Sequence, residues 1–289
     1  MSKYRITTPR SVLILGSGGQ RIGQAGEYDD AGLAAIKALR MNGIRTILVN
    51  PNMSAVQTAE GQADATYFLP VTEEFVTRVI EKEKPDSIIV NYGGKTAFSC
   101  ALALEESGTL ERYGIQVLGT SLESMRLTKD RSRFIAAMRA SGVPVTEAIG
   151  AASAEEAKAA AEKLGYPTLL RGDCTRGDEA PTICADARDI EAFYERAGAP
   201  KKVSVEEFLG GWKEIELEVL RDAMDNCVVA CGLENVDPIG IHTGDSVVIA
   251  PCQTLSDGEA RALRETAFQA VRTLGVIGEA NVRFAKDHD

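Results

Sequence analysis

The stretch from Trp212 to Leu255 constrains the fold more than any other part of the chain. In EIELEV (214–219) every second residue is a glutamate, a period-two pattern that predicts a β-strand with one acidic face and one apolar face. Asp225-Asn226 predicts a polar hairpin turn, and the apolar run 227–231 that follows predicts a buried partner strand. A glycine-bounded loop, GIHTGDS (240–246), leads to a third predicted strand at 246–251. The stretch therefore predicts an antiparallel unit.

Composition and charge narrow the class of protein. The chain has 289 residues, of which 44% are hydrophobic and 26% charged, as is usual for one or two globular domains. A formal net charge of −10 argues against a nucleic-acid partner. No apolar run approaches the roughly 18 residues of a membrane span. The six cysteines form no CxxC pair, so we expect reduced, buried thiols and a cytoplasmic or organelle-matrix location.

The first part of the chain alternates between predicted strands and helices. Strands are predicted at 11–16, 45–50, 65–69 and 87–90, and helices at 31–42, 72–83 and 97–107. This order is typical of a parallel sheet covered by helices on both faces. We therefore predict a three-layer α/β domain over residues 1–121.

Two glycine-rich turns in this domain raise the question of phosphate binding. One follows the strand at 11–16, and the other is GGKT at 93–96. The second turn lacks the full GxxxxGK[ST] spacing, and a glycine cluster alone is a weak signal of a phosphate-binding loop. We expect these glycines to allow close packing of strand and helix.

The second part of the chain predicts a further α/β domain, over residues 122–289. Helices are predicted within 121–141 and at 154–164, where Ser153 and Glu156 form a capping box. An edge strand is predicted at 203–208, a long amphipathic helix at 257–274, and a last strand at 278–284. The domain boundary is predicted just after Ser121.

Four segments of the chain resemble a known family. GWKEIELEVLRD, DNC, ENVDPIGIHTGDS and AP-x-QTL, in this order and spacing, closely resemble the large subunit of carbamoyl-phosphate synthetase, in its first, carboxyphosphate-forming half. Residues 13–32 are similar to the opening of that family's pre-ATP-grasp domain. The resemblance implies an α/β fold in which a pre-ATP-grasp domain (1–121) precedes a shortened ATP-grasp domain (122–289).

The resemblance also implies where the family's nucleotide site would lie. Arg131 and Arg171 stand where the family has phosphate-contacting arginines, and Glu207 and Glu214 where it lines the adenosine pocket. The remaining matched positions belong to two loops: Gly177 in the loop that closes over the phosphates, and Gly240, Ile241 and His242 in the loop that touches the nucleotide.

The sequence departs from the family in the phosphate-closing loop. Only Gly177 survives from the family's GG-x-G-x-G cluster. Asp178 and Glu179 place negative charge where polyphosphate would approach, and each such repulsion costs on the order of 1–4 kcal/mol. Pro181 removes a backbone N–H donor and stiffens the segment. The segment does not predict a phosphate cradle.

A second departure concerns the metal. Arg283 stands where the family has a magnesium-ligating Gln, and a guanidinium has no lone pair to offer a cation. The family's other ligands, a Glu and an Asn, would lie beyond Asp289. We therefore expect no metal ligand and no resident cofactor in this chain.

These departures lead to three hypotheses. The leading one is a degenerate, non-catalytic homologue that is retained for binding a protein partner or a small ligand. The second is an ATP-dependent enzyme that forms carboxyphosphate or carbamoyl phosphate with ATP and magnesium, its metal ligands completed by another chain. The third is a structural subunit of a larger assembly. Because the last predicted strand would present an open edge, we expect self-association or a protein partner that covers it.

Overall fold

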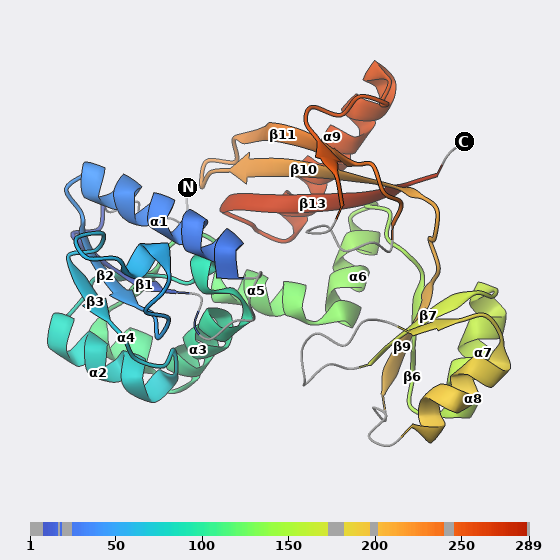
Figure 1. The fold of residues 1–289 in the computed structure, drawn as a ribbon, viewed down its shortest axis with the longest axis horizontal. Coiled ribbons are helices and arrows are strands. Elements are labelled where there is room, and N and C mark those ends of the chain that lie inside the picture. The colour runs from blue at the N-terminus through green and yellow to red at the C-terminus, as the bar shows by residue number, and fades with distance from the viewer. Residues whose placement is uncertain are drawn as a thin grey trace. The chain divides into compact units, whose positions relative to one another are not determined.

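A computed structural model describes residues 8–16, 18, 25–172, 182–196, 202–239 and 246–287. The chain forms two compact units, each assembled from three segments. The first unit contains Met1–Phe134, Leu220–Cys227 and Leu274–Glu279, and the second contains Ile135–Val219, Val228–Thr273 and Ala280–Asp289. Figure 1 traces the helices and strands of both. None of the described helices is long and apolar enough to cross a membrane.

A five-stranded parallel sheet forms the centre of the first unit. Its strands are β1 (Ser11–Leu15), β2 (Arg45–Val49), β3 (Ala65–Tyr67), β4 (Ser87–Ile89) and β5 (Gln116–Val117), in the order β3-β2-β1-β4-β5. Residues 12–15 of β1 are 0% exposed, because parallel sheets of this kind are covered on both faces. The predicted parallel α/β sheet is therefore confirmed.

Helices cover the two faces of this sheet. Helix α1 (Ala25–Met41) packs on one face, where Ile36 lies among Val12, Ile14 and Leu48. Helices α2 (Glu73–Glu83), α3 (Gly94–Glu106) and α4 (Thr109–Tyr113) lie on the opposite face (Figure 1). Short 3₁₀ turns occur at Val56–Thr58 and Asn91–Gly93. Helix α1 begins six residues earlier than the predicted start at residue 31, since Gly26 belongs to the helix and not to the preceding turn.

The second glycine-rich turn owes its glycine to close packing. A Cβ on Gly93 would lie 2.4 Å from the carbonyl oxygen of Gly16 and 2.3 Å from the Cβ of Ala97. A side chain at this position would therefore collide with the end of β1 and with α3. This geometry agrees with the expectation that the glycine serves packing.

The segment after the sheet contains two helices, α5 (Leu122–Lys129) and α6 (Arg131–Ala140). The Ser121 side chain accepts a hydrogen bond from the backbone N–H of Ser124 and so caps α5. The domain boundary after Ser121 stays a prediction.

The second unit begins with a four-stranded sheet in the order β6-β9-β7-β8. Its strands are β6 (Ala148–Ala151), β7 (Thr168–Gly172), β8 (Thr182–Cys184) and β9 (Val203–Glu207). Helices α7 (Ala154–Leu164) and α8 (Ala187–Glu195) share its apolar core. Ser153 caps α7 by accepting from the N–H of Glu156, as predicted, whereas the Glu156 carboxylate of the predicted capping box accepts from the N–H of Ala152. The predicted edge position of β9 is wrong, because β9 pairs with β6 on one side and with β7 on the other.

A second four-stranded sheet has the order β12-β11-β10-β13. It contains β10 (Lys213–Arg221), β11 (Cys227–Asn235), β12 (Val248–Ile249) and β13 (Gly278–Lys286), with α9 (Asp257–Thr273) between β12 and β13 in sequence. Residues 227–231 were predicted to be buried, but Val228 is 53% exposed. The third strand is also shorter than predicted. Apolar composition alone therefore overestimated the burial of β11.

Candidate functional site

Strand β10 carries the acidic face that its sequence predicts. Ile215, Leu217 and Val219 point into apolar surroundings and are at most 6% exposed. The glutamates alternate with them and share the opposite face. The side chain of Glu216 is 3% exposed and that of Glu214 is 13% exposed. Two carboxylates are therefore largely withdrawn from water, which requires partners that compensate for their lost hydration.

The partners of Glu216 come from the two neighbouring strands. Asn235 on β11 donates from Nδ2 to Oε1 at 2.9 Å, and Asn281 on β13 donates from Nδ2 to Oε2 at 2.7 Å. Arg283 on β13 places Nε 3.4 Å from the same Oε2. Glu216 thus accepts hydrogen bonds from two amides and lies beside a guanidinium.

The same two residues of β13 extend the cluster along β10. Asn281 also donates to Glu218 Oε1 at 2.7 Å, and Arg283 Nη1 lies 3.7 Å from Glu214 Oε1. Arg283 Nε further donates to Asn281 Oδ1 at 3.2 Å. We call this set the carboxylate ladder: Glu214, Glu216, Glu218, Asn235, Asn281 and Arg283.

The carboxylate ladder does not suit a magnesium ion at the Arg283 position. Magnesium takes oxygen ligands, whereas Arg283 presents N–H donors and a positive charge beside the carboxylates. Across the described residues, no group of three or more His, Cys, Asp or Glu side chains could hold a metal ion. The ladder is a set of ion-paired and hydrogen-bonded carboxylates with an arginine as its cation.

Arg171 is held by a buried carboxylate of its own sheet. Its Nε lies 3.4 Å from Glu206 Oε2, and the Glu206 side chain is 5% exposed while that of Arg171 is 47% exposed. The neighbouring Glu207 accepts from the backbone N–H of Glu147 at 3.4 Å. Arg171 therefore presents a partly exposed guanidinium anchored from β9.

The other predicted site residues are placed less completely. Arg131 begins α6 in the first unit, with its guanidinium 5.9 Å from the ring centre of Phe134, whereas Arg171, Glu207 and Glu214 belong to the second unit. The four loop residues lie outside the described part of the chain: Gly177, Gly240, Ile241 and His242. Their roles in nucleotide binding, like those of the described residues, stay predictions.

Sequence reasoning missed Glu234, which organises the loop after β12. Its carboxylate accepts from the N–H groups of Gln253 at 2.9 Å and Thr254 at 3.1 Å, and from the Thr254 hydroxyl. Lys213 donates to the same hydroxyl at 3.0 Å. Burial raises the pKa of Glu234, but the hydrogen bonds from Thr254 and Gln253 outweigh it, so the pKa lies below its ordinary value. Glu234 therefore serves as an ionised anchor.

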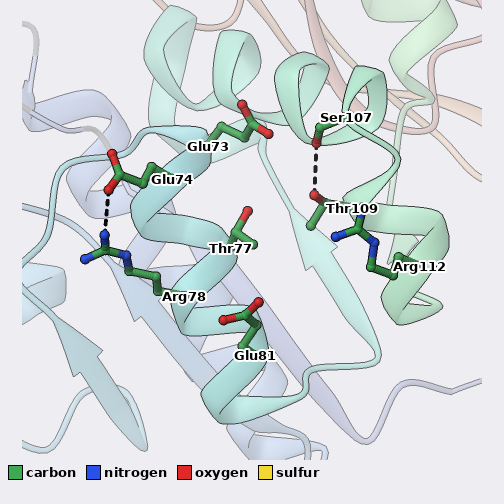
Figure 2. Close-up of a pocket in the computed structure, with 8 residues that line it drawn as sticks. All are labelled: Glu73, Glu74, Thr77, Arg78, Glu81, Ser107, Thr109 and Arg112. Atoms are coloured by element: carbon green, nitrogen blue, oxygen red, sulfur yellow. Dashed lines mark hydrogen bonds and ion pairs between the residues drawn. The ribbon is translucent and has the colours of Figure 1, made fainter.

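A separate polar pocket of about 460 Å³ lies on the first unit, between α2 and the α3–α4 turn (Figure 2). Its charges are partly paired internally, since Arg78 Nη2 lies 2.6 Å from Glu74 Oε1. Ser107 and Thr109 hydrogen-bond to each other across its rim at 2.9 Å. No residue that the sequence predicts for nucleotide binding lines this pocket.

Two family models match almost the whole chain. The carbamoyl phosphate synthase preATP-grasp domain matches residues 8–127, and the ATP-binding domain of the carbamoyl-phosphate synthase L chain matches residues 130–289. The arginine-specific large chain of carbamoyl phosphate synthase from Eremothecium gossypii is 48% identical over 96% of this chain and 25% of its own length. The mitochondrial ammonia-dependent synthase of Homo sapiens is 46% identical over 95% of this chain and 18% of its own length.

A third relative, the multifunctional protein CAD of Squalus acanthias, is 47% identical over 96% of this chain and 12% of its own length. The chain thus spans between 12% and 25% of these curated relatives. Among solved structures, the biotin carboxylase domain of Hydrogenobacter thermophilus 2-oxoglutarate carboxylase has a TM-score of 0.76 at 20% identity, over 98% of this chain and 62% of that structure. Campylobacter jejuni biotin carboxylase has a TM-score of 0.74 at 22% identity, over 97% and 63%.

These structural likenesses confirm the predicted α/β fold of pre-ATP-grasp and ATP-grasp type. The matched family models and the sequence identities of 46–48% agree with the segments that first pointed to the family. The chain belongs to the carbamoyl-phosphate synthase family and is homologous to the N-terminal half of its large chain.

Proposed function

We propose that this region is a non-catalytic member of its family that binds a protein partner or a small ligand. The observation that carries the proposal is the position of Arg283, whose guanidinium lies 3.4 Å from Glu216 and 3.7 Å from Glu214. Phosphoryl transfer by ATP-grasp proteins needs a metal to bridge phosphate oxygens and to stabilise charge in the transition state. An arginine ion-paired to the ladder cannot bridge oxygens in that way.

The sequence of the phosphate-closing loop supports the same proposal. Asp178 and Glu179 would repel polyphosphate, and this loss is independent of the change at residue 283. Two unrelated substitutions therefore act against the same ligand. Weak nucleotide binding remains compatible with the proposal, because Arg171 still presents a partly exposed guanidinium. Neither ATP nor magnesium is then required as a cofactor.

A second candidate is an ATP-dependent enzyme whose metal ligands are completed by another chain. The observation that favours it is the high identity to relatives named as carbamoyl-phosphate synthases, including 46% to the human mitochondrial one. A third candidate is a structural subunit of a larger assembly, favoured by relatives of which this chain spans as little as 12%. The cytoplasm or an organelle matrix is compatible with all three candidates.

Nucleotide binding with and without magnesium tests the leading candidate. We expect any thermal shift caused by ATP to be the same in magnesium and in EDTA. The double variant D178G/E179G should bind ATP more tightly, because two like charges are removed, without gaining hydrolysis. A thermal shift that requires magnesium would favour the second candidate. Native mass measurement of the protein from its source tests the third, which expects a fixed larger complex.

A further inference from the structure

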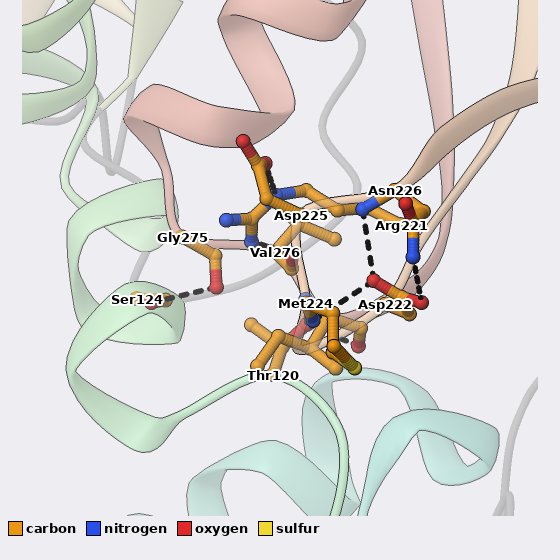
Figure 3. A network of polar contacts seen from close by, with 10 residues as sticks. Thr120, Ser124, Arg221, Asp222, Met224, Asp225, Asn226, Gly275 and Val276 are labelled. Atoms are coloured by element: carbon orange, nitrogen blue, oxygen red, sulfur yellow. Dashed lines mark hydrogen bonds and ion pairs between the residues drawn. The ribbon is translucent and has the colours of Figure 1, made fainter. Parts of the chain in front are cut away.

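Three consecutive backbone residues of the turn between α9 and β13 are held by side chains from elsewhere in the first unit (Figure 3). The turn residues are Gly275, Val276 and Ile277, and their partners are Ser124, Arg221 and Thr120. The partners come from residues 120–124, at the start of α5, and from the β10–β11 hairpin. Sequence separations of 157, 151 and 55 residues show that none of these contacts is local.

Thr120 makes the most complete of these contacts. Its hydroxyl donates to the carbonyl oxygen of Ile277 at 3.0 Å and accepts from the N–H of Ile277 at 3.1 Å. Thr120 is 7% exposed, so water cannot readily replace it. One hydroxyl thus satisfies both backbone groups of a residue, as a neighbouring strand would.

Two glycines make this close approach possible. Gly275 has a φ of +67°, and a Cβ there would lie 2.9 Å from the hydroxyl oxygen of Ser124. Gly119 has a φ of +81°, and its Cβ would lie 3.4 Å from the carbonyl oxygen of Ile277. Both positions favour glycine for backbone conformation and for space. The fit of the turn against residues 119–124 is therefore specific.

Arg221 completes the set from the hairpin. Its Nη1 donates to the carbonyl oxygen of Val276 at 2.6 Å, and its Nε donates to Asp225 Oδ1 at 2.8 Å. The hairpin turn that follows Arg221 is stabilised by Asp222. Its Oδ1 accepts hydrogen bonds from the N–H groups of Met224 and Asn226, both at 2.9 Å. The guanidinium is therefore fixed at both ends, and its side chain is 17% exposed.

The course of the chain gives these contacts a consequence for folding. The first unit consists of one long N-terminal segment and two short ones, Leu220–Cys227 and Leu274–Glu279. The two short segments are joined through the chain to the second unit on either side. Thr120 and Ser124 bind the segment 274–279 to the long segment, and Arg221 binds the segment 220–227 to 274–279.

We propose that Thr120, Ser124 and Arg221 form a side-chain latch on residues 275–277, and that this latch makes the stability of the parallel sheet depend on the α9–β13 turn. Opening the latch separates residues 275–277 from residues 119–124, which follow the parallel sheet, and so releases both short segments of the first unit.

Hydrogen exchange on the full chain tests the latch. In Thr120→Val, the shape is kept but both hydrogen bonds to Ile277 are lost. We expect faster exchange at Ile277 and at residues 221–226, and about tenfold faster exchange in β1, since two buried backbone groups lose their partner. The melting temperature should fall by about 4 °C. Thr120→Ser retains the hydroxyl and should behave as wild type.

Thr266→Val is the matched control, because the Thr266 hydroxyl donates within α9, to the carbonyl oxygen of Ala262 at 2.9 Å. It should leave exchange in β1 unchanged. If Thr120→Val fails to fold, Ser124→Ala offers a milder opening of the same latch, through a 3.5 Å contact. Unchanged exchange in β1 in both Thr120→Val and Ser124→Ala would overturn the proposal, as would equal acceleration in Thr266→Val.

Discussion

The parallel sheet of the first unit and the sheet with the order β12-β11-β10-β13 bury different kinds of side chain. In β1, residues 12–15 are all apolar and 0% exposed, with helices on both faces. In β10, the apolar face is also buried, but the other face buries the side chain of Glu216, which is 3% exposed. The core of the first sheet is mainly apolar, whereas the second sheet also buries a carboxylate that depends on specific hydrogen bonds and one guanidinium.

The two sheets thus differ in the chemical groups that they bury. A buried apolar side chain tolerates few substitutions, and it carries no group that can ionise or bind a polar ligand. A buried carboxylate is costly unless its partners are in place, and Glu216 has such partners in Asn235, Asn281 and Arg283. Arg283 supplies the ladder's cation.

The largest expected effect is in the apolar sheet. Leu13→Ala removes a side chain that is 0% exposed and should lower the free energy of unfolding by about 3–4 kcal/mol, because a cavity is left in a packed core. Urea unfolding of the full chain measures this. Val228→Ala, at a position 53% exposed on β11, should cost about 0.5 kcal/mol or less. Equal losses in both variants would contradict the contrast.

A smaller loss is expected in the carboxylate ladder. Arg283→Gln leaves Glu216 with its two amide partners but without its cation. Because the arginine side chain is 56% exposed, we expect only about 1 kcal/mol in the free energy of unfolding. Arg188→Gln is the control, since Arg188 pairs with Asp186 two residues away and is 87% exposed. A ladder variant as stable as the control would show that Arg283 does not stabilise the ladder.

How much of this site the sequence could reveal depends on the distance between partners. The alternation in residues 214–219 predicted both faces of β10, because side-chain direction in a strand is local. The partners of Glu216 were not predictable, since Asn235 and Asn281 are 19 and 65 residues away. The position of β9 failed for the same reason: strand order depends on pairing between distant segments. The sequence did contain one signal of the partners on β13: Asn281 and Arg283 are two residues apart in a predicted strand, so their side chains share one face.

The dependence of stability on pH below 4.5 should show the contribution of Glu259, which is hydrogen-bonded at the start of α9. Hydrogen bonds from Ser256 and the nearby Lys286 lower the pKa of Glu259 from 4.5 to about 2. A lowered folded-state pKa stabilises the protein above pH 4.5, and this contribution is lost as the pH falls towards 2. Glu259→Gln should therefore be less stable than wild type at pH 6 and equal to it near pH 2. Thermal melts across this range measure the difference; a constant gap at all pH values would contradict it.

The reactivity of the cysteine thiols compares buried and half-buried positions without any substitution. Burial raises the pKa of Cys100 to about 12 and that of Cys184 to about 11, and both are buried. Cys231, on β11, is only half-buried. Iodoacetamide at pH 8, followed by mass spectrometry, should modify Cys231 well before Cys100 or Cys184, because the thiolate is the reactive form. Equal rates would contradict the burial of these thiols.

The most direct test of the proposed loss of catalysis is ATP hydrolysis by the purified 289-residue chain, assayed with bicarbonate in magnesium and in EDTA. Because Arg283 is ion-paired to the carboxylate ladder, we predict the same background rate in both conditions and no stimulation by bicarbonate. Arg171→Ala should leave that background unchanged. Magnesium-dependent, bicarbonate-stimulated hydrolysis that Arg171→Ala abolishes would contradict the account and establish the chain as an enzyme.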